Sequence, residues 1–352
     1  MPYGSISVDQ INNTTGYSLG AGNASIMKNR IINGAMAINQ RAFSGTPTNG
    51  AYTLDRWYTG VAQASKLTIS QNAGSVTPPV GFVNYLGITS SSAYSVTSTD
   101  FFYIEQIVEG LNVGDLAWGT ANAKTITVSA QVYSSLTGTF GGVIQNGAGN
   151  RSYPFTYTIS SANTWTPISV TIAGDTTGTW ATDNSAGLVL LFSVGAGSSR
   201  SGTAGSWAGS AYYAPTGAVS VVGTNGATFY ITGVQLEVGS SATGFEYRQY
   251  GTELSLCQRY YQIYTAAGGG LGIFGRANSP TSGNTFPIPF GMYPVPMRAA
   301  ATIIGLTAAS GSNATALGTS GGNTAFPALC FNSVSSGDCY YYGIAFAASA
   351  EL

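Results

Sequence analysis

The chain of 352 residues contains no histidine. Histidine is the usual general base near neutral pH and the commonest metal ligand, so its absence excludes Ser-His-Asp triads, Cys-His pairs and His-based zinc sites. Charged residues are also scarce, at 7% of the chain, whereas an ordinary soluble protein has roughly 25%. We therefore expect a protein that is not an enzyme and that recognises its partners by shape and neutral polar groups.

The few charges nearly cancel, with 12 Lys and Arg against 13 Asp and Glu and a formal net charge of −1. Such a balance offers no attraction to nucleic-acid phosphates or to an anionic membrane surface. Long hydrophobic runs are absent as well. The most apolar stretch covers only residues 186–194, whereas a membrane helix needs about 20 residues. We expect no nucleic-acid binding and no membrane insertion, and we expect residues 186–194 to form a buried strand.

Cysteine is rare too, and the three examples are Cys257, Cys330 and Cys339. So small and odd a number does not build a disulfide framework, and it leaves at least one thiol free. Cys330 and Cys339 could face each other across a hairpin, either as a disulfide or as two reduced thiols. The first residues lack the basic start and apolar run of a signal peptide, so assembly in a cytoplasm favours reduced thiols.

The chain is rich in Gly, Ser, Thr and aromatic residues, in short alternating runs between turn residues. This pattern is typical of an all-β protein. Residues 125–132 alternate strictly, which predicts a strand with one face in the core and the other in water. The residues assigned to the core are Ile126, Val128, Ala130 and Val132, and those assigned to water are Thr125, Thr127, Ser129 and Gln131.

A second strand is predicted over residues 229–238, where the alternation changes phase. The apolar residues before the change are Phe229 and Ile231, and those after it are Val234, Leu236 and Val238. Because a slip of one residue turns every later side chain to the opposite face, the strand needs a β-bulge to restore its phase. Gly233 is the residue that tolerates a bulge best.

Short motifs at the two ends of this β region are similar to a known family. Residues 29–34 read N-x-I-x-N-G, residues 233–239 read G-V-Q-L-E-V-G, and residues 242–248 read A-T-x-F-E-Y-R. They resemble the opening and closing motifs of the β-sandwich found in fibre and other surface proteins of tailed-phage virions. Residues 165–180 also resemble a hairpin of the carbohydrate-binding-module-like jelly rolls in such fibres. The resemblance implies a jelly-roll sandwich in a homotrimer.

Three parts are predicted along the chain. Residues 1–28 are polar with sparse apolar points, and they form an extended N-terminal arm that is either a disordered tail or an anchor on other virion structural proteins. Residues 29–248 form the jelly-roll β-sandwich. Residues 249–352 form a helical linker plus a smaller β-rich C-terminal domain, because residues 252–261 carry a helical pattern and resemble a linker of the same virion family. Prolines interrupt the apolar run at 286–297, which predicts edge strands or the first residues of strands.

Candidate binding residues are aromatic, because the C–H faces of sugars stack on Trp and Tyr rings. Trp207, Tyr212 and Tyr213 lie in a long Gly/Ser loop without a core pattern, and we predict a carbohydrate-binding site there. The alternative is that these rings pack on the sandwich or on a neighbouring subunit. The tryptophans assigned to the core are Trp57, Trp118, Trp165 and Trp180.

Acidic residues give no catalytic motif. A glycan-cleaving fibre needs two carboxylates about 5 to 10 Å apart. Glu105 and Glu109 come nearest to such a pair, but in a strand they lie about 13 Å apart, at roughly 3.3 Å per residue. We predict no catalytic residue and no cofactor, and a structural calcium held by oxygen ligands stays open. Arg151 and Arg200 are interpreted as solvated loop cations.

These observations predict a structural protein of a phage virion. Its role is that of a tail fibre which attaches to the host cell surface by binding glycan and is anchored to the particle by residues 1–28. A capsid fibre or decoration protein without a receptor site fits the same fold equally well. A polysaccharide depolymerase is the least favoured alternative.

Overall fold

The computed structural model describes residues 28–265, 273–319 and 322–352. The chain divides into two compact units, one that runs to Arg248 and includes Leu352, and one that spans Gln249–Glu351. The predicted arm, residues 1–28, lies outside the described residues except for Lys28. No helix in the described parts of the chain has the length and hydropathy needed to span a membrane.

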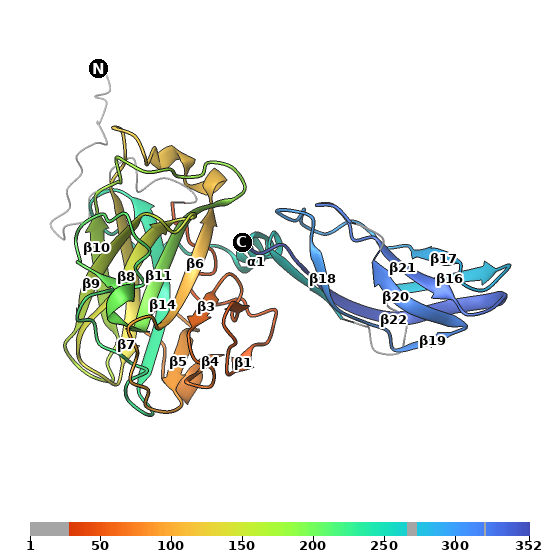
Figure 1. Ribbon diagram of the computed structural model, residues 1–352, viewed down its shortest axis with the longest axis horizontal. Helices are drawn as coiled ribbons and strands as arrows, with labels where there is room; N and C mark the ends of the chain where they lie inside the picture. The colour runs from red at the N-terminus through yellow and green to blue at the C-terminus, as the bar shows by residue number, and fades with distance from the viewer. Residues whose placement is uncertain (1–27, 266–272, 320–321) are drawn as a thin grey trace, which may run out of the picture. The chain divides into compact units, whose positions relative to one another are not determined.

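The first unit is a sandwich of two antiparallel six-stranded sheets (Figure 1). The β14 sheet contains, in spatial order, β1 (Ser44–Gly45), β4 (Leu67–Gln71), β5 (Leu86–Ser90), β14 (Thr228–Val238), β7 (Ile126–Ser134) and β10 (Thr166–Ile172). The β11 sheet contains β2 (Ala51–Tyr52), β3 (Tyr58–Val61), β6 (Phe101–Glu109), β11 (Ala186–Ala196), β8 (Gly138–Asn146) and β9 (Ser152–Ile159). The prediction of an all-β sandwich is confirmed. The chain passes repeatedly from one sheet to the other, as in a jelly roll.

One apolar core fills the space between the two sheets. Ile126, Val128, Ala130 and Val132 of β7 all point into it, at 4% exposed or less. The prediction that Thr127 faces water is wrong, because this residue is fully buried. Its hydroxyl donates a hydrogen bond to the carbonyl of Gly239 at 2.9 Å, so the segment after β14 covers this part of the outer face. Residues 186–194 form the buried strand β11, as predicted.

The bulge predicted in the closing strand is present at Gly233. The pairing of β14 with β7 shifts register between Thr232 and Gln235, and Gly233 has a φ of 62°. A Cβ atom at this position would lie 2.5 Å from the ring of Phe82. Both the backbone conformation and the close approach of this ring therefore require glycine.

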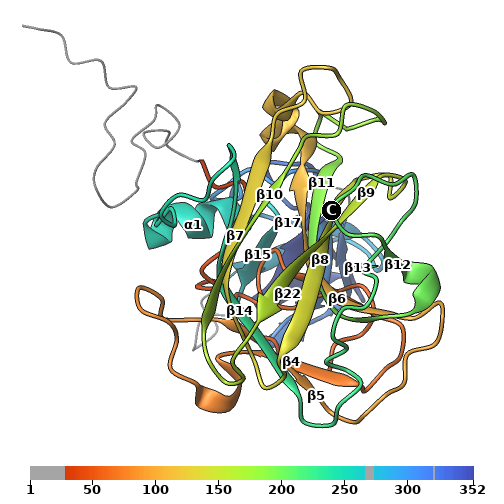
Figure 2. The ribbon, with the colours of Figure 1, turned by 90° about the vertical axis from the view of Figure 1, so that its left-hand side faces the viewer.

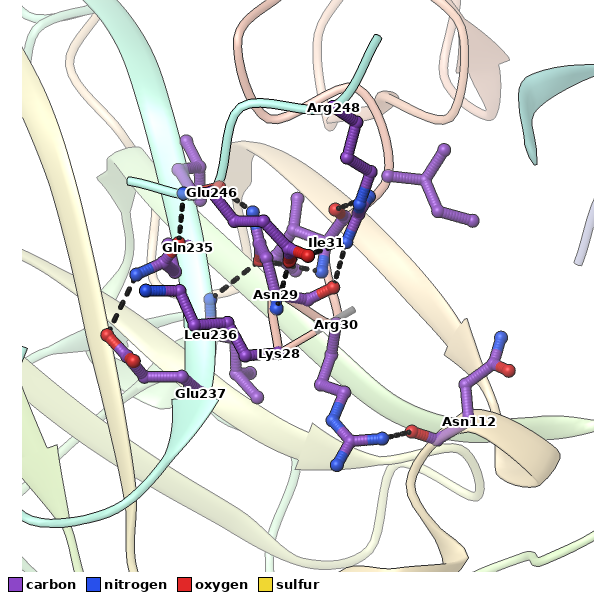
Figure 3. Close-up of polar contacts among 12 residues, drawn as sticks. Lys28, Asn29, Arg30, Ile31, Asn112, Gln235, Leu236, Glu237, Glu246 and Arg248 are labelled. Carbon is purple, nitrogen blue, oxygen red and sulfur yellow. Dashed lines mark hydrogen bonds and ion pairs between the residues drawn. The ribbon is translucent and has the colours of Figure 1, made fainter. Parts of the chain in front are cut away.

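The family-like opening and closing motifs, far apart in the sequence, meet in a polar network (Figure 3). The backbone N–H of Asn29 donates to the Glu246 carboxylate at 2.7 Å, and its Nδ2 donates to the Val234 carbonyl at 3.0 Å. Its Oδ1 accepts the N–H of Leu236 at 3.1 Å. Asn29 thereby satisfies backbone groups of β14 beyond residues 228–231, the part of this strand that pairs with β5.

The rest of this network ties the exit segment to the same strand. Gln235 accepts the N–H of Glu246 at 2.8 Å and donates to Glu237 at 2.8 Å. Arg248 donates to the Ile31 carbonyl at 3.1 Å and lies 3.4 Å from the Glu246 carboxylate. These motifs thus close the sandwich.

Several connections of the first unit contain short elements. They are the 3₁₀ turns η3 (Ala73–Ser75), η4 (Gly110–Asn112), η5 (Gly114–Leu116) and η6 (Ser198–Arg200) and the parallel pair β12 (Ser201–Gly202) and β13 (Ala214–Pro215). Figure 2 shows β12, β13 and η6 beside the β11 sheet, on the side away from β7 and β10. Gly141 of β8 permits this packing, because a Cβ there would lie 2.1 Å from Pro215.

The second unit begins with the helix α1 (Tyr250–Gln258), where the sequence pattern predicts one. Its longest strand, β22 (Gly337–Ser349), pairs on one side with β15 (Tyr261–Tyr264) and β16 (Ile273–Ser279) and on the other with β18 (Thr302–Thr307) and β19 (Ser310–Ser312). A second sheet has the order β17 (Thr285–Ile288), β21 (Leu329–Ser333) and β20 (Ala314–Thr319). Pro287 lies in β17, which is an edge strand as predicted.

The cysteines of this unit are all free thiols. Cys330 lies on β21, opposite Pro287 of β17, and Cys339 lies on β22, opposite Ala277 of β16. The two therefore belong to different sheets, and β21 and β22 do not pair with each other. The thiol of Cys339 donates to the Ala277 carbonyl at 3.2 Å.

Candidate functional site

Three tryptophans from separate connections meet at one place on the sandwich. Trp118 follows η5, Trp180 lies in the β10–β11 connection, and Trp207 lies in the loop after β12. The ring centroids of Trp118 and Trp180 lie 4.6 Å apart, and those of Trp207 lie 5.3 Å from Trp118 and 5.6 Å from Trp180. All three pairs are edge-to-face, an arrangement that aromatic quadrupoles favour. Tyr153 of β9 adds a fourth ring, 5.2 Å from Trp207.

Each indole N–H of this cluster is held by a backbone carbonyl. Trp118 donates to Lys124 at 2.7 Å, Trp180 to Thr177 at 3.3 Å, and Trp207 to Ala173 at 2.9 Å. Fixed donors of this kind set the orientation of all three rings. The cluster is therefore rigid, although Trp180 and Trp207 are only half-buried.

A pocket of about 210 Å³ lies beside the cluster, and we call it the tryptophan pocket. Trp118 and Trp180 line it, together with the buried apolar side chains of Val113, Leu116 and Leu188. The exposed residues Thr120 and Thr182 also line it. Pockets for drug-sized ligands measure about 300–1,000 Å³, so the tryptophan pocket suits a smaller ligand, such as a single sugar ring.

The ion pair next to the cluster contradicts the interpretation of Arg151 as a solvated cation. Its guanidinium donates two hydrogen bonds of 2.7 Å to Asp175, whose side chain is 2% exposed. The guanidinium also lies 6.0 Å from the ring centroid of Trp207. Burial raises the pKa of Asp175, but the hydrogen bonds from Arg151 and Thr177 outweigh burial and leave this pKa below its ordinary value.

Tyr212 and Tyr213, predicted to form one site with Trp207, do not join the tryptophan cluster. Tyr213 lies over the outer face of the β11 sheet, where it stacks on Tyr103 at 5.0 Å with the ring planes 7° apart. The carbonyl of Tyr212 accepts a hydrogen bond from Gln145. Arg200, the other predicted solvated cation, lies 5.6 Å from the ring centroid of Tyr213. The predicted loop therefore supplies two separate aromatic regions.

Of the four tryptophans assigned to the core, Trp57 and Trp118 are buried. Trp165 and Trp180 are half-buried, so their assignment is only partly correct. Trp165 packs edge-to-face on Tyr85 at 5.4 Å. Sequence reasoning missed Trp118 and Trp180 as pocket residues. The available signal was that Trp180 follows the polar segment 175–179, which has no core pattern of its own.

Acidic side chains form no metal site among residues 28–265, 273–319 and 322–352, where no group of three or more Cys, Asp or Glu lies close enough to hold an ion. Glu105 and Glu109, the pair considered for glycan cleavage, both lie on β6 and are 7% and 1% exposed. Asp183 follows Thr182, which lines the tryptophan pocket. It accepts hydrogen bonds from Ser185 that lower its pKa.

No protein-family model matches the sequence, and a search of curated proteins finds no match. Among solved structures, the chain is similar to the enzymatically active domain of tailspike protein 4 of bacteriophage CBA120. The identity is 11% and the TM-score 0.33, over 60% of this chain and 22% of that one. The present chain thus spans less than a quarter of that tailspike domain.

Two carbohydrate-binding modules show similar likeness. One, described as CBM4, has 14% identity and a TM-score of 0.31, over 59% of this chain and 98% of its own. The other is the family 11 module of Clostridium thermocellum, solved with a mixed-linked tetrasaccharide, with 10% identity and a TM-score of 0.30 over 58% and 99% of the two chains. Likenesses this weak carry no weight for function, which has to be inferred from the residues of this chain.

Proposed function

We propose that the protein is a glycan-binding structural protein that holds a sugar ring in the tryptophan pocket. The observation that carries the proposal is the pocket itself, a concave site with Trp118 and Trp180 in its wall and the polar residues Thr120 and Thr182 beside them. Sugars present an apolar C–H face to aromatic rings and hydroxyls to polar groups at the ring edge. Rings fixed by backbone hydrogen bonds lose little freedom when a ligand binds.

Binding without catalysis is part of this proposal. Glycoside hydrolysis needs one carboxyl group that keeps its proton near neutral pH. Burial raises the pKa of Asp175, but hydrogen bonds from Arg151 and Thr177 lower it overall, and Ser185 lowers the pKa of Asp183. Neither of these two acids is therefore suited to donate a proton to a sugar in the tryptophan pocket. Shape and stacking support a receptor-binding role in preference to a depolymerase.

The virion role is the finer part of the proposal. The motifs that resemble phage-fibre sandwiches form the closing network around Asn29 and Glu246, which supports a sandwich of that type. We propose a tail fibre, in the virion, that attaches to host-surface glycan, with residues 1–28 as its anchor. Electron microscopy of particles carrying labelled protein tests whether the chain lies on the tail or on the capsid.

A homotrimer also belongs to the proposal. In the second unit, Ile263 of β15 and Ile304 of β18 lie on either side of Ala347 in one row across the sheet. The two isoleucines are 44% and 50% exposed. Apolar side chains exposed in one row favour a partner surface. Sedimentation of the full chain tests this part, and a monomer at micromolar concentration contradicts it.

The glycan proposal is tested on a glycan array and then by titration of the best hit against Trp180→Ala. We expect affinity to fall at least tenfold, which corresponds to about 1.4 kcal/mol. Trp165→Ala is the matched control, because Trp165 is also half-buried and also donates its indole N–H to a backbone carbonyl, that of Thr77 at 2.8 Å. It lies in the separate cluster around Tyr85.

The control variant should bind like the unmodified protein. A Trp180→Ala variant that keeps full affinity contradicts the pocket as the binding site. An unmodified protein that binds nothing on the array contradicts glycan binding altogether and favours a capsid fibre or decoration protein.

A further inference from the structure

A second candidate site lies on the outer face of the β11 sheet, around Glu105. Glu105 of β6 pairs across the sheet with Tyr58 of β3 on one side and with Leu191 of β11 on the other. Tyr103 lies two residues before it on the same face, since side chains alternate along a strand. The Glu105 residue is 7% exposed, so its carboxyl group sits in an aromatic and aliphatic surrounding.

The polar atoms of this region lack protein partners. In the described parts of the chain, no hydrogen bond or ion pair reaches the carboxyl group of Glu105 or the hydroxyls of Tyr58, Tyr103 and Tyr213. By contrast, four other buried carboxylates of the unit accept hydrogen bonds, namely Asp55, Asp100, Asp175 and Glu237. Buried polar groups without a partner are rare in proteins and call for a water, an ion or a ligand. Here such a carboxyl group lies among three tyrosines, of which Tyr103 is buried and Tyr58 and Tyr213 are half-buried.

The rings around Glu105 form an electron-rich lining. Tyr103 and Tyr213 stack at 5.0 Å, and Phe101 lies 5.2 Å from Tyr213. Arg200 is the cation recorded next to these rings, 5.6 Å from the centroid of Tyr213. Its Nε donates to the carbonyl of Thr99 at 3.3 Å, so this guanidinium is held by the backbone and forms no ion pair with Glu105.

The carboxyl group is therefore without a counter-charge. Burial raises the pKa of Glu105 to about 8, because an ionised carboxylate away from water is unfavourable. A cation brought next to it would restore the ionised form. Tyrosine hydroxyl oxygens near the carboxyl group are able to accept hydrogen bonds from the N–H groups of such a cation.

We propose that Glu105, Tyr58, Tyr103 and Tyr213 form a binding site for a ligand that carries an ammonium group. The carboxylate supplies the counter-charge, and the tyrosine hydroxyls accept hydrogen bonds where the ligand has N–H groups. Two kinds of cell-surface component carry such a group, namely amino sugars and choline-bearing polymers. The site shares no residue with the tryptophan pocket, so this inference stands or falls independently of the glycan proposal.

The test is calorimetric titration of the full chain with choline, whose charge does not change with pH. Its neutral isostere, 3,3-dimethylbutan-1-ol, has the same shape without the charge. We expect choline to bind and the isostere to bind at least tenfold more weakly. Because most Glu105 side chains hold a proton at neutral pH, binding should release protons. Choline affinity should therefore increase about tenfold for each unit by which the pH is raised toward about 8, and it should be constant above that pH.

Glu105→Gln is the informative variant, since the amide keeps the shape of the protonated acid and should leave the fold intact. We expect it to lose choline binding at least tenfold and to lose the pH dependence, with an unchanged thermal unfolding midpoint at acidic pH. A parallel titration with glucosamine and N-acetylglucosamine separates the two ligand sources, because only the first has a charged amine. Equal binding of choline and its isostere, equal binding by the variant, or no binding of either amine overturns the proposal.

Discussion

The two aromatic regions of the sandwich differ in how their polar groups are satisfied. In the tryptophan cluster, every indole N–H reaches a carbonyl, and the adjacent Asp175 has both Arg151 and a hydroxyl as partners. Around Glu105, in the described structure, a carboxyl group and three tyrosine hydroxyls have none. Both regions are rich in aromatic rings, but the polar groups are hydrogen-bonded in the tryptophan cluster and, among the described residues, have no protein partner around Glu105.

This difference indicates what each region is able to recognise. A cluster whose donors and charges are already paired offers a ligand only shape and stacking, which suits a neutral sugar face. A buried acid without a counter-ion offers charge and selects a cation. Two carboxylates in one domain thus have pKa shifts of opposite sign, and the variants below exploit that contrast.

The largest expected effect concerns the pH dependence of stability through Glu105. Its pKa is about 8 in the folded state against an ordinary value of 4.5, so between these values the folded state keeps a proton that the unfolded state has lost. The contribution of Glu105 to the free energy of unfolding is therefore greatest below about pH 4.5, and it decreases as the pH rises to about 8. The total loss is on the order of 4 to 5 kcal/mol, at about 1.36 kcal/mol per unit.

Urea unfolding of the first unit from about pH 5 to about pH 9 measures this loss. Glu105→Gln should remove most of the slope, because its side chain does not titrate. If the variant and the unmodified protein lose stability in parallel, Glu105 is not the titrating group and the contrast between the two regions disappears.

Arg151→Leu should have the next largest effect. It leaves Asp175 buried without a counter-charge, which costs about 3 kcal/mol or more. The stability that this ion pair contributes changes with pH in the opposite direction to the contribution of Glu105. The pKa of Asp175 is lowered in the folded state, so the stability from this pair is present above the ordinary value of 3.8 and is lost as the pH falls through the folded-state pKa.

The matched control is Arg276→Leu in the second unit. Arg276 makes the same two-bond contact with Asp338, at 2.9 and 2.8 Å, but both side chains are exposed. Water screens such a pair, so little change is expected. Thermal unfolding followed for each unit separates the two variants, and an equal loss in both would show that burial of Asp175 is not the cause.

The sequence predicted those features that depend on neighbours along the chain. The phase change around Gly233 is visible in five apolar residues, and the bulge is found there. The alternation of β7 is likewise local. Its prediction failed at Thr127, because a segment distant in sequence, at Gly239, covers the face on which this residue lies. The sequence also predicted the edge position of Pro287, which follows from its missing N–H.

The candidate sites depend on contacts between distant residues, so they were predicted only in part. Trp118, Trp180 and Trp207 come from three connections, and no spacing in the sequence shows that these connections meet. The loop with Trp207 and Tyr213 was recognised as unusual, but its rings go to different regions. Glu105 was singled out in the sequence only as a possible pair with Glu109, because the absence of a partner for its carboxyl group is visible only in three dimensions.

The smallest expected effect, and the sharpest separation of the two regions, comes from a crossed pair of variants in that loop. Trp207 is not part of the pocket lining but packs against Trp118 and Trp180. Trp207→Ala should therefore loosen both pocket rings and weaken glycan binding about fivefold to tenfold, roughly 1 kcal/mol, with choline binding unchanged. Tyr213→Ala should do the reverse, because its ring stacks on Tyr103 beside Glu105.

Both variants alter the same loop, so a general disturbance of the loop should weaken both ligands in both variants. Titration of each variant with the best glycan and with choline gives four affinities that decide between these cases. A crossed pattern, with one loss in each variant, means that the loop serves two independent sites. A uniform loss means that Trp207 and Tyr213 only hold the loop on the sandwich, and the packing alternative then accounts for both residues.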